Sequence, residues 1–392
     1  MQYRNNKQGE PISILGYGCM RFTQTAGRID IDKTEREIME AFHAGVNYFD
    51  TAYIYPGSEA ALGKILEKNG IRDQVNIATK LPHYMVKKPE SMETFFQEEL
   101  KRLRTDHVDY YLMHMLNDVK TWERLKSLGI AQWLEDKKKS GAIRHIGFSY
   151  HGNSDMFCRL VNAYDWDFCQ IQYNYLDVHT QAGVTGLHHA AERGIPVIIM
   201  EPLRGGKLVN NLPTKAKHLM EQYPLKRSPA EWAFRWLWNQ PEVTCVLSGM
   251  NSLEMVRENV KAASDAQIDS FSAEDHALLH DVVRILNEKT KVGCTGCRYC
   301  MPCPKHVDIP GTFAAYNRKA SDGSLSALIE YYMCTGIRQD YTGPANCIGC
   351  GKCEQHCPQH IEIRKQLKDA QKALETPLYQ IVKKILPFFM KY

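Results

Sequence analysis

Nine of the 13 cysteines in this 392-residue chain lie in its last quarter, and eight of those nine form two closely spaced runs. The runs consist of Cys294, Cys297, Cys300 and Cys303, and of Cys347, Cys350, Cys353 and Cys357. In a reducing compartment, clustered cysteines more often bind metals or carry out redox chemistry than form disulfides. The spacing therefore predicts a metal centre built from thiolate sulfur atoms.

The second run, CIGCGKCEQHCP, separates its cysteines by two, two and three residues and ends in Cys-Pro. This pattern matches the bacterial ferredoxin run that binds a [4Fe-4S] cluster. Zinc sites consist of paired Cys-x-x-Cys units, usually without a third cysteine in register, so zinc is the weaker alternative. In the first run, CTGCRYCMPCP, the last gap is one residue shorter. Because the fourth cysteine of a run binds the other cluster in two-cluster ferredoxins, this gap affects how Cys303 reaches its iron.

We expect two [4Fe-4S] clusters, and the alternative is a single cluster with a degenerate first run. Cys334 is either a buried thiol or a replacement ligand for Cys303. The 43 residues between Cys303 and Cys347 have a helical pattern, which favours a mainly α-helical ferredoxin-like domain. The other four cysteines lie in predicted strands or helices and are interpreted as core residues: Cys19, Cys158, Cys169 and Cys245.

Four polar side chains end or follow successive apolar segments earlier in the chain: Asp50, Tyr55, Lys80 and His114. A phenol with an ordinary pKa near 10 is a poor proton donor at neutral pH, but a neighbouring ammonium favours the phenolate and lowers that pKa. Lys80 would supply this charge with Asp50 as its counter-ion, and neutral His114 would orient a carbonyl or share in proton transfer. Such an assembly protonates a carbonyl oxygen as hydride reaches the carbon.

Eight apolar, β-rich segments alternate with longer amphipathic segments from about residue 12 to residue 290, which is typical of parallel βα units. The predicted strands are ISILGYG, VNYFDTA, QVNIATK, VDYYLMH, IRHIGFS, FCQIQYN, PVIIMEP and VTCVLSG. The predicted helices span 33–44, 91–104, 121–139, 181–193, 228–239 and 252–262, with N-caps at Thr34, Ser91, Ser228 and Ser252.

Eight strands over about 280 residues, without a GxGxxG motif, favour a (β/α)8 TIM barrel over a doubly wound sheet. The reactive residues of such a barrel lie at the carboxyl ends of its strands, where the four polar side chains are expected. We therefore predict an α/β protein with a barrel at residues 1–290. A small, mainly α-helical ferredoxin-like iron–sulfur domain with a helical tail is expected at residues 291–392.

Three motifs in the barrel segment resemble the aldo-keto reductase family, and the resemblance covers roughly residues 1–290. DTAYIYPGSE followed by ALG is similar to that family's second-strand signature, IATK to its lysine strand and DYYLMH to its histidine strand. The resemblance implies a catalytic tetrad of Asp50, Tyr55, Lys80 and His114, with Tyr55 as the general acid, and a nicotinamide cofactor extended across the barrel mouth. The whole chain resembles the subgroup with a C-terminal [4Fe-4S] ferredoxin-type domain.

The same resemblance implies a cofactor site in the second half of the barrel. GFSYH and QIQYN match segments at the nicotinamide end, MEPLRGGKL resembles the phosphate-binding loop and SGMNSLEMVRENV the adenosine end. The implied cofactor-binding residues are Ser149, Gln172, Leu203, Gly206, Lys207, Glu258 and Asn259.

Four positions depart from the family pattern. Tyr150 stands where an asparagine is usual, and Met200 stands where an aromatic residue would stack on the nicotinamide. The basic residues that NADP-preferring members place on the 2′-phosphate correspond to Gly249 and Met255. The sequence therefore leaves both NADP(H) and NAD(H) as candidate cofactors.

Three functions fit this sequence. The first is NAD(P)H-dependent reduction of an aldehyde or ketone, or the reverse, with the clusters serving electron transfer, redox sensing or structure. The second is one-electron transfer between the clusters and a flavin or a redox-active substrate, because hydride chemistry normally needs a flavin to exchange single electrons. The sequence has no visible flavin motif. The third is a redox-sensing, nicotinamide-binding regulatory protein, against which the complete tetrad argues.

Composition and charge limit the partners. The formal net charge of +4 is spread along the chain and predicts no nucleic-acid partner. The first residues do not resemble a signal peptide, and no apolar run has the length of a membrane span, so we expect a cytoplasmic protein. The expected partners are a small carbonyl substrate and a separate redox protein, and the oligomeric state stays open.

The C-terminal residues predict an amphipathic helix with lysines beside an apolar stripe. We expect the stripe to pack on this chain or on a sister chain, with a membrane surface as the alternative. The stripe consists of Leu378, Ile381, Val382, Ile385, Phe388 and Phe389, and the lysines are Lys383, Lys384 and Lys391.

Overall fold

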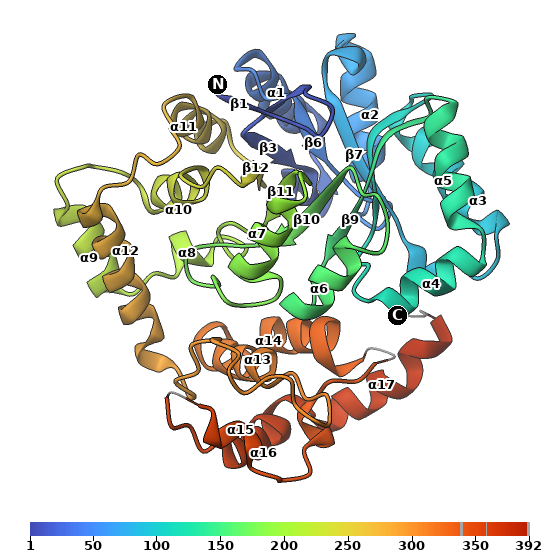
Figure 1. Cartoon of the computed structure of the whole chain (residues 1–392). Coiled ribbons are helices and arrows are strands. Elements are labelled where there is room, and N and C mark those ends of the chain that lie inside the picture. The colour runs from blue at the N-terminus through green and yellow to red at the C-terminus, as the bar shows by residue number, and fades with distance from the viewer. Residues whose placement is uncertain (338–339, 358, 390–392) are drawn as a thin grey trace.

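Eight parallel strands close into a barrel with helices around it (Figure 1). The structure is a computed structural model that describes residues 1–337, 340–357 and 359–389. Around the barrel the strand order is that of the chain, and the last strand pairs with the first. The strands are β3 (Leu15–Gly18), β6 (Tyr48–Asp50), β7 (Asn76–Leu81), β8 (Val108–Met113), β9 (Ile143–Tyr150), β10 (Phe168–Gln172), β11 (Val197–Met200) and β12 (Val243–Ser248). The predicted (β/α)8 barrel is confirmed.

Amphipathic helices cover the outside of the barrel, so that most strand residues are buried on both faces of the sheet. The helices up to residue 286 are α1 (Ile31–His43), α2 (Ser58–Asn69), α3 (Glu90–Leu103), α4 (Val119–Ser127), α5 (Ile130–Lys139), α6 (Ser154–Val161), α7 (Gly183–Glu192), α8 (Lys207–Asn210), α9 (Thr214–Gln222), α10 (Pro229–Trp238), α11 (Leu253–Ser264) and α12 (Ala273–Leu286).

Three details of the helix prediction are wrong. The helix predicted over 121–139 is divided into α4 and α5, because Gly129 adopts a left-handed φ of 84° that a helix interior does not allow. The N-cap of α1 is Asp30 instead of Thr34, and α3 begins after Pro89, which places Ser91 inside the helix. The predicted caps of α10 and α11, Ser228 and Ser252, are confirmed.

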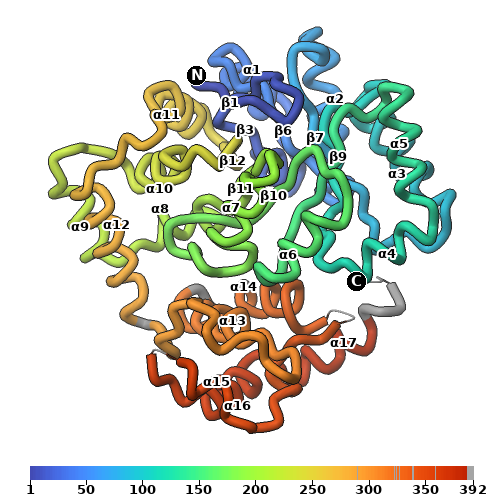
Figure 2. The backbone as a smooth tube through the Cα atoms, in the orientation of Figure 1, coloured from blue at the N-terminus to red at the C-terminus, as the bar shows by residue number. Residues whose placement is uncertain are grey.

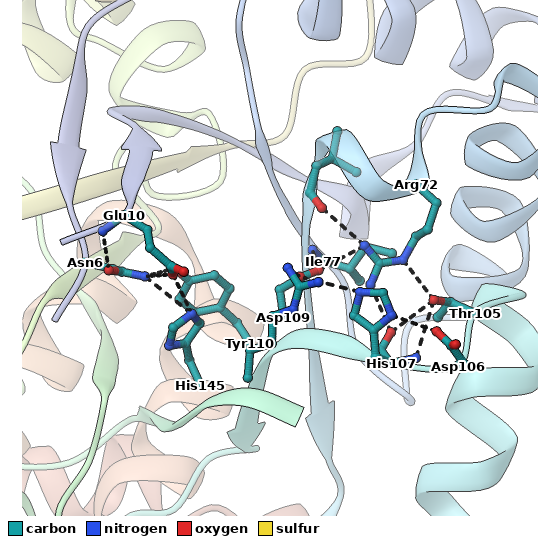
Figure 3. Close-up of polar contacts among 12 residues, drawn as sticks. Asn6, Glu10, Arg72, Ile77, Thr105, Asp106, His107, Asp109, Tyr110 and His145 are labelled. Atoms are coloured by element: carbon teal, nitrogen blue, oxygen red, sulfur yellow. Dashed lines mark hydrogen bonds and ion pairs between the residues drawn. The ribbon is translucent and has the colours of Figure 1, made fainter. Parts of the chain in front are cut away.

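A hairpin of β1 (Tyr3–Asn5) and β2 (Pro11–Ser13) lies at the amino-terminal end of the barrel. Residues 12–18, predicted as one strand, are thus shared between this hairpin and β3. The Asn6 side chain donates to the Tyr110 hydroxyl at 2.9 Å, and Glu10 Oε2 lies 3.1 Å from His145 Nε2 (Figure 3). These contacts hold the hairpin against the starts of β8 and β9.

Asp109, at the start of β8, is a buried carboxylate that links three segments near the same end of the barrel (Figure 3). It accepts a hydrogen bond from the Ile77 backbone N–H at 2.8 Å and lies 3.0 Å from Arg72 Nη1 and 2.9 Å from Arg144 Nη1. Because burial excludes water from the carboxylate, these ion pairs are less screened than a surface pair.

Asp109→Asn should therefore lower the free energy of unfolding by about 3 kcal/mol, since it leaves two guanidinium groups without their counter-ion. Asp165→Asn is the matched control, because the Lys7–Asp165 ion pair joins the same barrel end but its carboxylate is 93% exposed. That change should cost less than about 1 kcal/mol. Chemical denaturation followed by circular dichroism measures both, and equal losses would contradict the role given to burial.

The cysteine-rich region, residues 291–392, is mainly helical and follows α12. Its helices are α13 (Ile309–Asp322), α14 (Ser324–Tyr331), a π-helical turn (Tyr332–Gly336), α15 (Lys352–Gln355), α16 (Ile363–Leu374) and α17 (Pro377–Phe389). One small core contains Val292, Val307, Ile309, Phe313, Ile363 and Leu367, with six of the eight clustered cysteines packed against it. A second contains Ala315, Tyr331, Ala370, Leu374 and Tyr379. The predicted domain boundary at residue 290 stays a prediction.

The cysteine-rich region lies next to the barrel (Figure 2), and Arg318 on α13 contacts Asp177 in the loop after β10. Asp155 at the start of α6 forms an ion pair with Arg298, and Gly296 packs against His179 in the loop after β10. These barrel residues follow β9 and β10. The region therefore contacts the end of the barrel where reactive residues are expected.

The C-terminal helix is present as α17, and its Tyr379 is buried against Tyr331 and Tyr332. Leu378, Ile381 and Ile385 are exposed, whereas the side chains of Phe388 and Phe389, and the whole of Lys391, lie outside the described residues. Across the described ranges, no helix combines the length and the apolar character needed to cross a membrane.

Candidate active site

The carboxyl ends of β6, β7 and β8 bring together the four polar residues that the sequence singled out. Asp50 ends β6, Lys80 is the penultimate residue of β7, His114 directly follows β8 and Tyr55 lies in the turn before α2. Lys80 Nζ donates to Asp50 Oδ1 and to the Thr51 carbonyl, both at 2.6 Å. The centre of the Tyr55 ring lies 5.2 Å from Lys80 Nζ and 6.0 Å from the His114 ring.

Tyr55 has a higher pKa than the sequence-based argument expected. Burial raises its pKa, and the carboxylates of Asp50 and Glu201 act in the same direction. The net shift is thus upward, whereas the sequence predicted a lowered pKa, because removal from water disfavours the charged phenolate. Tyr55 consequently carries its proton at neutral pH.

His114 is a neutral imidazole. Burial lowers its pKa well below the usual range, and the charge of Lys80 lowers it further. Its buried Nδ1 atom makes no hydrogen bond within the described part of the chain. A buried ring nitrogen without a partner is the kind of polar atom that a ligand satisfies.

Gln170 on β10 belongs to this group, although the sequence analysis missed it. Its Nε2 donates to Asp50 Oδ2 at 3.3 Å, whereas Lys80 donates to the other carboxylate oxygen, Oδ1. Strand alternation could have indicated Gln170, because it lies two residues before the predicted site residue Gln172 and alternate residues of a strand point to the same face. Gln170 thereby fixes the orientation of the carboxylate that binds Lys80.

The predicted residues at the nicotinamide end lie on β9 and β10, next to this group. Ser149 Oγ accepts a hydrogen bond from the Met115 backbone N–H at 2.9 Å, which places it beside the residue that follows His114. Gln172 accepts a hydrogen bond from Gln181 Nε2 at 2.9 Å, and its own Nε2 lies 3.4 Å from Asp177 Oδ2. Both side chains are buried.

The other predicted cofactor residues lie farther along the barrel end. Leu203 and Gly206 belong to the loop after β11, where Glu201, Arg204, Gly205 and Gly206 all have positive φ, and Lys207 begins α8. On α11, which follows β12, Asn259 is buried and donates to Ser248 Oγ at 3.1 Å, whereas Glu258 is exposed. These seven residues thus lie near or after the carboxyl ends of consecutive strands from β9 to β12.

Arg21, which the sequence analysis did not consider, lies between the last two of these loops. A Cβ atom at Gly205 would lie 3.0 Å from Arg21 Nη2, and one at Gly249 would lie 3.2 Å from Arg21 Cδ. Arg21 is exposed, and no ion pair of its guanidinium is found among the described residues. The Arg21 side chain therefore lies beside Gly249. Gly249 corresponds to one of the two positions where NADP-preferring members of the resembled family have a basic residue.

The cysteines line two cavities in the cysteine-rich region. The cavity of about 370 Å³ is lined by Cys300, Cys303, Cys347, Cys350 and Cys353. The narrower one, of about 20 Å³, is lined by Cys294, Cys297, Cys300 and Cys357. In the described part of the chain no three cysteine, histidine or acidic side chains converge as the ligands of one metal ion would. Cys334 lines neither cavity and is buried in the π-helical turn.

The fold and the site together define a (β/α)8 enzyme with its polar residues at the carboxyl ends of the strands. The family model "Aldo/keto reductase family" matches residues 14–283, and the model "4Fe-4S dicluster domain" matches residues 293–362. The first match covers more than half of the chain. This protein therefore belongs to the aldo/keto reductase family and is an oxidoreductase, and its cysteine-rich region matches an iron–sulfur domain.

Two curated relatives show the extent of the similarity. The uncharacterized oxidoreductase YrpG of Bacillus subtilis (strain 168) is 26% identical over 326 residues, which cover 72% of this chain and 93% of YrpG. L-Galactose dehydrogenase of Arabidopsis thaliana is 25% identical over 279 residues, or 66% of this chain and 86% of that protein.

Two solved structures share the barrel fold. The holo form of aldo-keto reductase AKR11C1 from Bacillus halodurans has a TM-score of 0.59 and 24% identity, covering 72% of this chain and 96% of its own. An aldo-keto reductase from Klebsiella pneumoniae in complex with NADPH also has a TM-score of 0.59, with 21% identity and the same coverage.

Proposed function

We propose that this protein reduces an aldehyde or ketone to the alcohol with NAD(P)H, and that Tyr55 is the proton donor. The observation that carries the proposal is the buried Asp50–Lys80 ion pair beside Tyr55 and His114 at adjacent strand ends. In the balanced reaction the carbonyl, NAD(P)H and one proton give the alcohol and NAD(P)+. When bound, the nicotinamide supplies the hydride.

Each residue of the tetrad has one task in this reaction. Tyr55 holds a proton on its hydroxyl oxygen and transfers it to the carbonyl oxygen. The Lys80 ammonium stabilises the negative charge that then develops on the phenol, and the ion pair with Asp50 holds Lys80 in its buried position. Neutral His114 donates a hydrogen bond that orients the carbonyl oxygen. This role requires no change in the protonation of His114.

The cofactor would lie over the carboxyl ends of β9 to β12. Ser149 and Gln172 would hold the carboxamide, the loop with Leu203, Gly206 and Lys207 the phosphates, and Glu258 with Asn259 the adenosine end. Two features support this placement: the left-handed loop after β11 and the complex of the Klebsiella relative with NADPH.

Arg21→Ala should weaken NADPH binding more than NADH binding, with an increase of about tenfold in the dissociation constant for NADPH, since a hydrogen bond to a charged group contributes about 1.5–3 kcal/mol. The reason is that Arg21 provides the cation next to Gly249. Fluorescence titration of the protein with each cofactor measures the change. Arg28→Ala, on an exposed strand of the same N-terminal segment, is the control. Equal weakening for both cofactors would contradict a role at the 2′-phosphate.

We also propose two [4Fe-4S] clusters with crossed ligands. The first would be bound by Cys294, Cys297, Cys300 and Cys357, and the second by Cys303, Cys347, Cys350 and Cys353. The composition of the two cavities supports this proposal, because the last cysteine of each run lines the cavity of the other run. When bound, such clusters supply one-electron chemistry or structural stability.

A second candidate function is electron exchange between the cysteine-rich region and the barrel mouth, with a flavin or a redox-active substrate and a separate redox partner. It is favoured by the packing of Gly296, in the first cysteine run, against His179 after β10. Anaerobic titration with NADPH, followed by absorbance, separates the candidates. Bleaching of the iron–sulfur absorbance supports electron exchange, whereas turnover of a panel of aldehydes and ketones without bleaching supports carbonyl reduction alone. Cofactor binding with neither response would indicate a regulatory protein.

A further inference from the structure

Asp177, in the loop after β10, joins the barrel mouth to the cysteine-rich region. Its Oδ2 lies 3.1 Å from Arg204 Nε, in the loop after β11, and 3.1 Å from Arg318 Nη2, on α13. All three side chains are nearly or fully buried, with exposed fractions of 8% to 11%. One carboxylate of the barrel is therefore shared between a barrel arginine and an arginine of the cysteine-rich region.

Arg318 is itself held in place by a second carboxylate. Its Nε lies 2.5 Å from Glu330 Oε2 on α14. A guanidinium has a planar fork of donors, so two contacts fix its position and its plane. Burial alone would raise the pKa of Asp177, but Arg204 and Arg318 outweigh burial and hold it below the usual range, so Asp177 is ionised. Arg318 thus lies between ionised Asp177 and Glu330, and burial raises the pKa of the Glu330 carboxyl.

The same oxygen of Asp177 reaches the predicted nicotinamide end of the site. Gln172 Nε2 lies 3.4 Å from it, and Gln181 Nε2 donates to Gln172 Oε1 at 2.9 Å. The Gln172 amide is therefore held at both of its ends. A side-chain amide such as that of Gln172 binds a planar carboxamide well only when the plane of the amide is fixed. The residues that hydrogen-bond to the amide, here Asp177 and Gln181, fix that plane.

We propose that Arg318 is a positioning residue for the nicotinamide site of the barrel. Through Asp177 it fixes Gln172, so that the cysteine-rich region completes a cofactor site whose direct contacts all come from the barrel. This inference rests on the proposed binding of NAD(P)H. Its consequence is that docking of the cysteine-rich region raises the affinity of the barrel for the cofactor.

The test uses the full chain with its iron, purified anaerobically. Arg318→Gln combined with Glu330→Gln replaces both partners of the Arg318–Glu330 contact by uncharged amides and leaves the Asp177–Arg204 pair in place. We expect the dissociation constant for NADPH, measured by fluorescence titration, to rise about tenfold, within the usual range of coupling between sites. The KM for NADPH should rise with it, whereas kcat at saturating NADPH should stay unchanged. Iron content and circular dichroism establish that the variant is folded.

Two further variants separate positioning from a general loss of docking. Arg298→Gln removes an ion pair across the same interface, with Asp155, that does not reach Gln172. It should leave NADPH binding unchanged. Arg318→Lys keeps a positive charge opposite Asp177 and should restore part of the affinity.

Wild-type affinity in the double variant would overturn the inference while the proposed function stands. Tighter binding, or an equal loss in Arg298→Gln, would also overturn it. If the wild-type chain itself binds neither NADPH nor NADH, that result contradicts the proposed function, and the inference about Arg318 falls with it.

Discussion

Tyr55→Phe should lower kcat/KM for carbonyl reduction by about 10²- to 10⁴-fold, the usual contribution of a positioned proton donor. The change removes one oxygen atom and keeps the ring, which packs against Lys80 and His114. NADPH binding should therefore stay the same. Steady-state kinetics with a panel of aldehydes and ketones, together with fluorescence titration of NADPH, separate the two effects.

Tyr53→Phe is the matched control, because Tyr53 lies in the same turn but faces away from the tetrad. Its ring packs 5.0 Å from Phe95, and the guanidinium of Arg102 lies 4.3 Å from its centre. We expect wild-type turnover from this variant. Unchanged turnover in Tyr55→Phe would refute the assignment of the proton donor, whatever the control does.

Cys303→Ala and Cys357→Ala should each lower the iron content by about half, since a [4Fe-4S] cluster that loses one of its four thiolates is expected to be lost. The crossed assignment makes a sharper prediction for pairs. Cys303→Ala with Cys350→Ala removes two ligands of one cluster and should lose no more iron than either change alone. Cys303→Ala with Cys297→Ala affects both clusters and should lose nearly all iron. Iron and sulfide analysis after anaerobic purification measures each case.

Cys334→Ala is the control for these variants, because Cys334 is buried away from both cavities. It should keep its full iron content. Loss of iron from this variant would support Cys334 as a ligand in place of Cys303. Additive loss from Cys303→Ala with Cys350→Ala would contradict the crossed arrangement.

The barrel could be predicted because its signal is local and periodic. Each buried strand is a short apolar segment, as in residues 108–113, and each is followed by an amphipathic helix. Asp50, Lys80 and His114 are at or next to strand ends, so the fold alone brings them together. The crossed cysteine cavities likewise follow from spacing that is visible in the sequence.

The contacts that the sequence did not reveal join residues far apart in the chain. Arg21 lies beside Gly249, and Asp177 lies beside Arg318, through tertiary packing that no local pattern encodes. The pKa of Tyr55 was predicted with the wrong sign for a related reason. Its nearest cation is visible in a motif, whereas its burial depends on the packing of the whole barrel mouth.

The small cores of the cysteine-rich region have a consequence for the order in which the protein matures. The barrel contains a large apolar core of its own, whereas the core beside the cysteines has six buried residues. A segment with so small a core commonly needs its inorganic group to fold. We therefore expect iron supply to determine whether the cysteine-rich region of a newly made chain folds. A chain made without iron would have a folded barrel in which Asp177 keeps Arg204 as its partner but lacks Arg318.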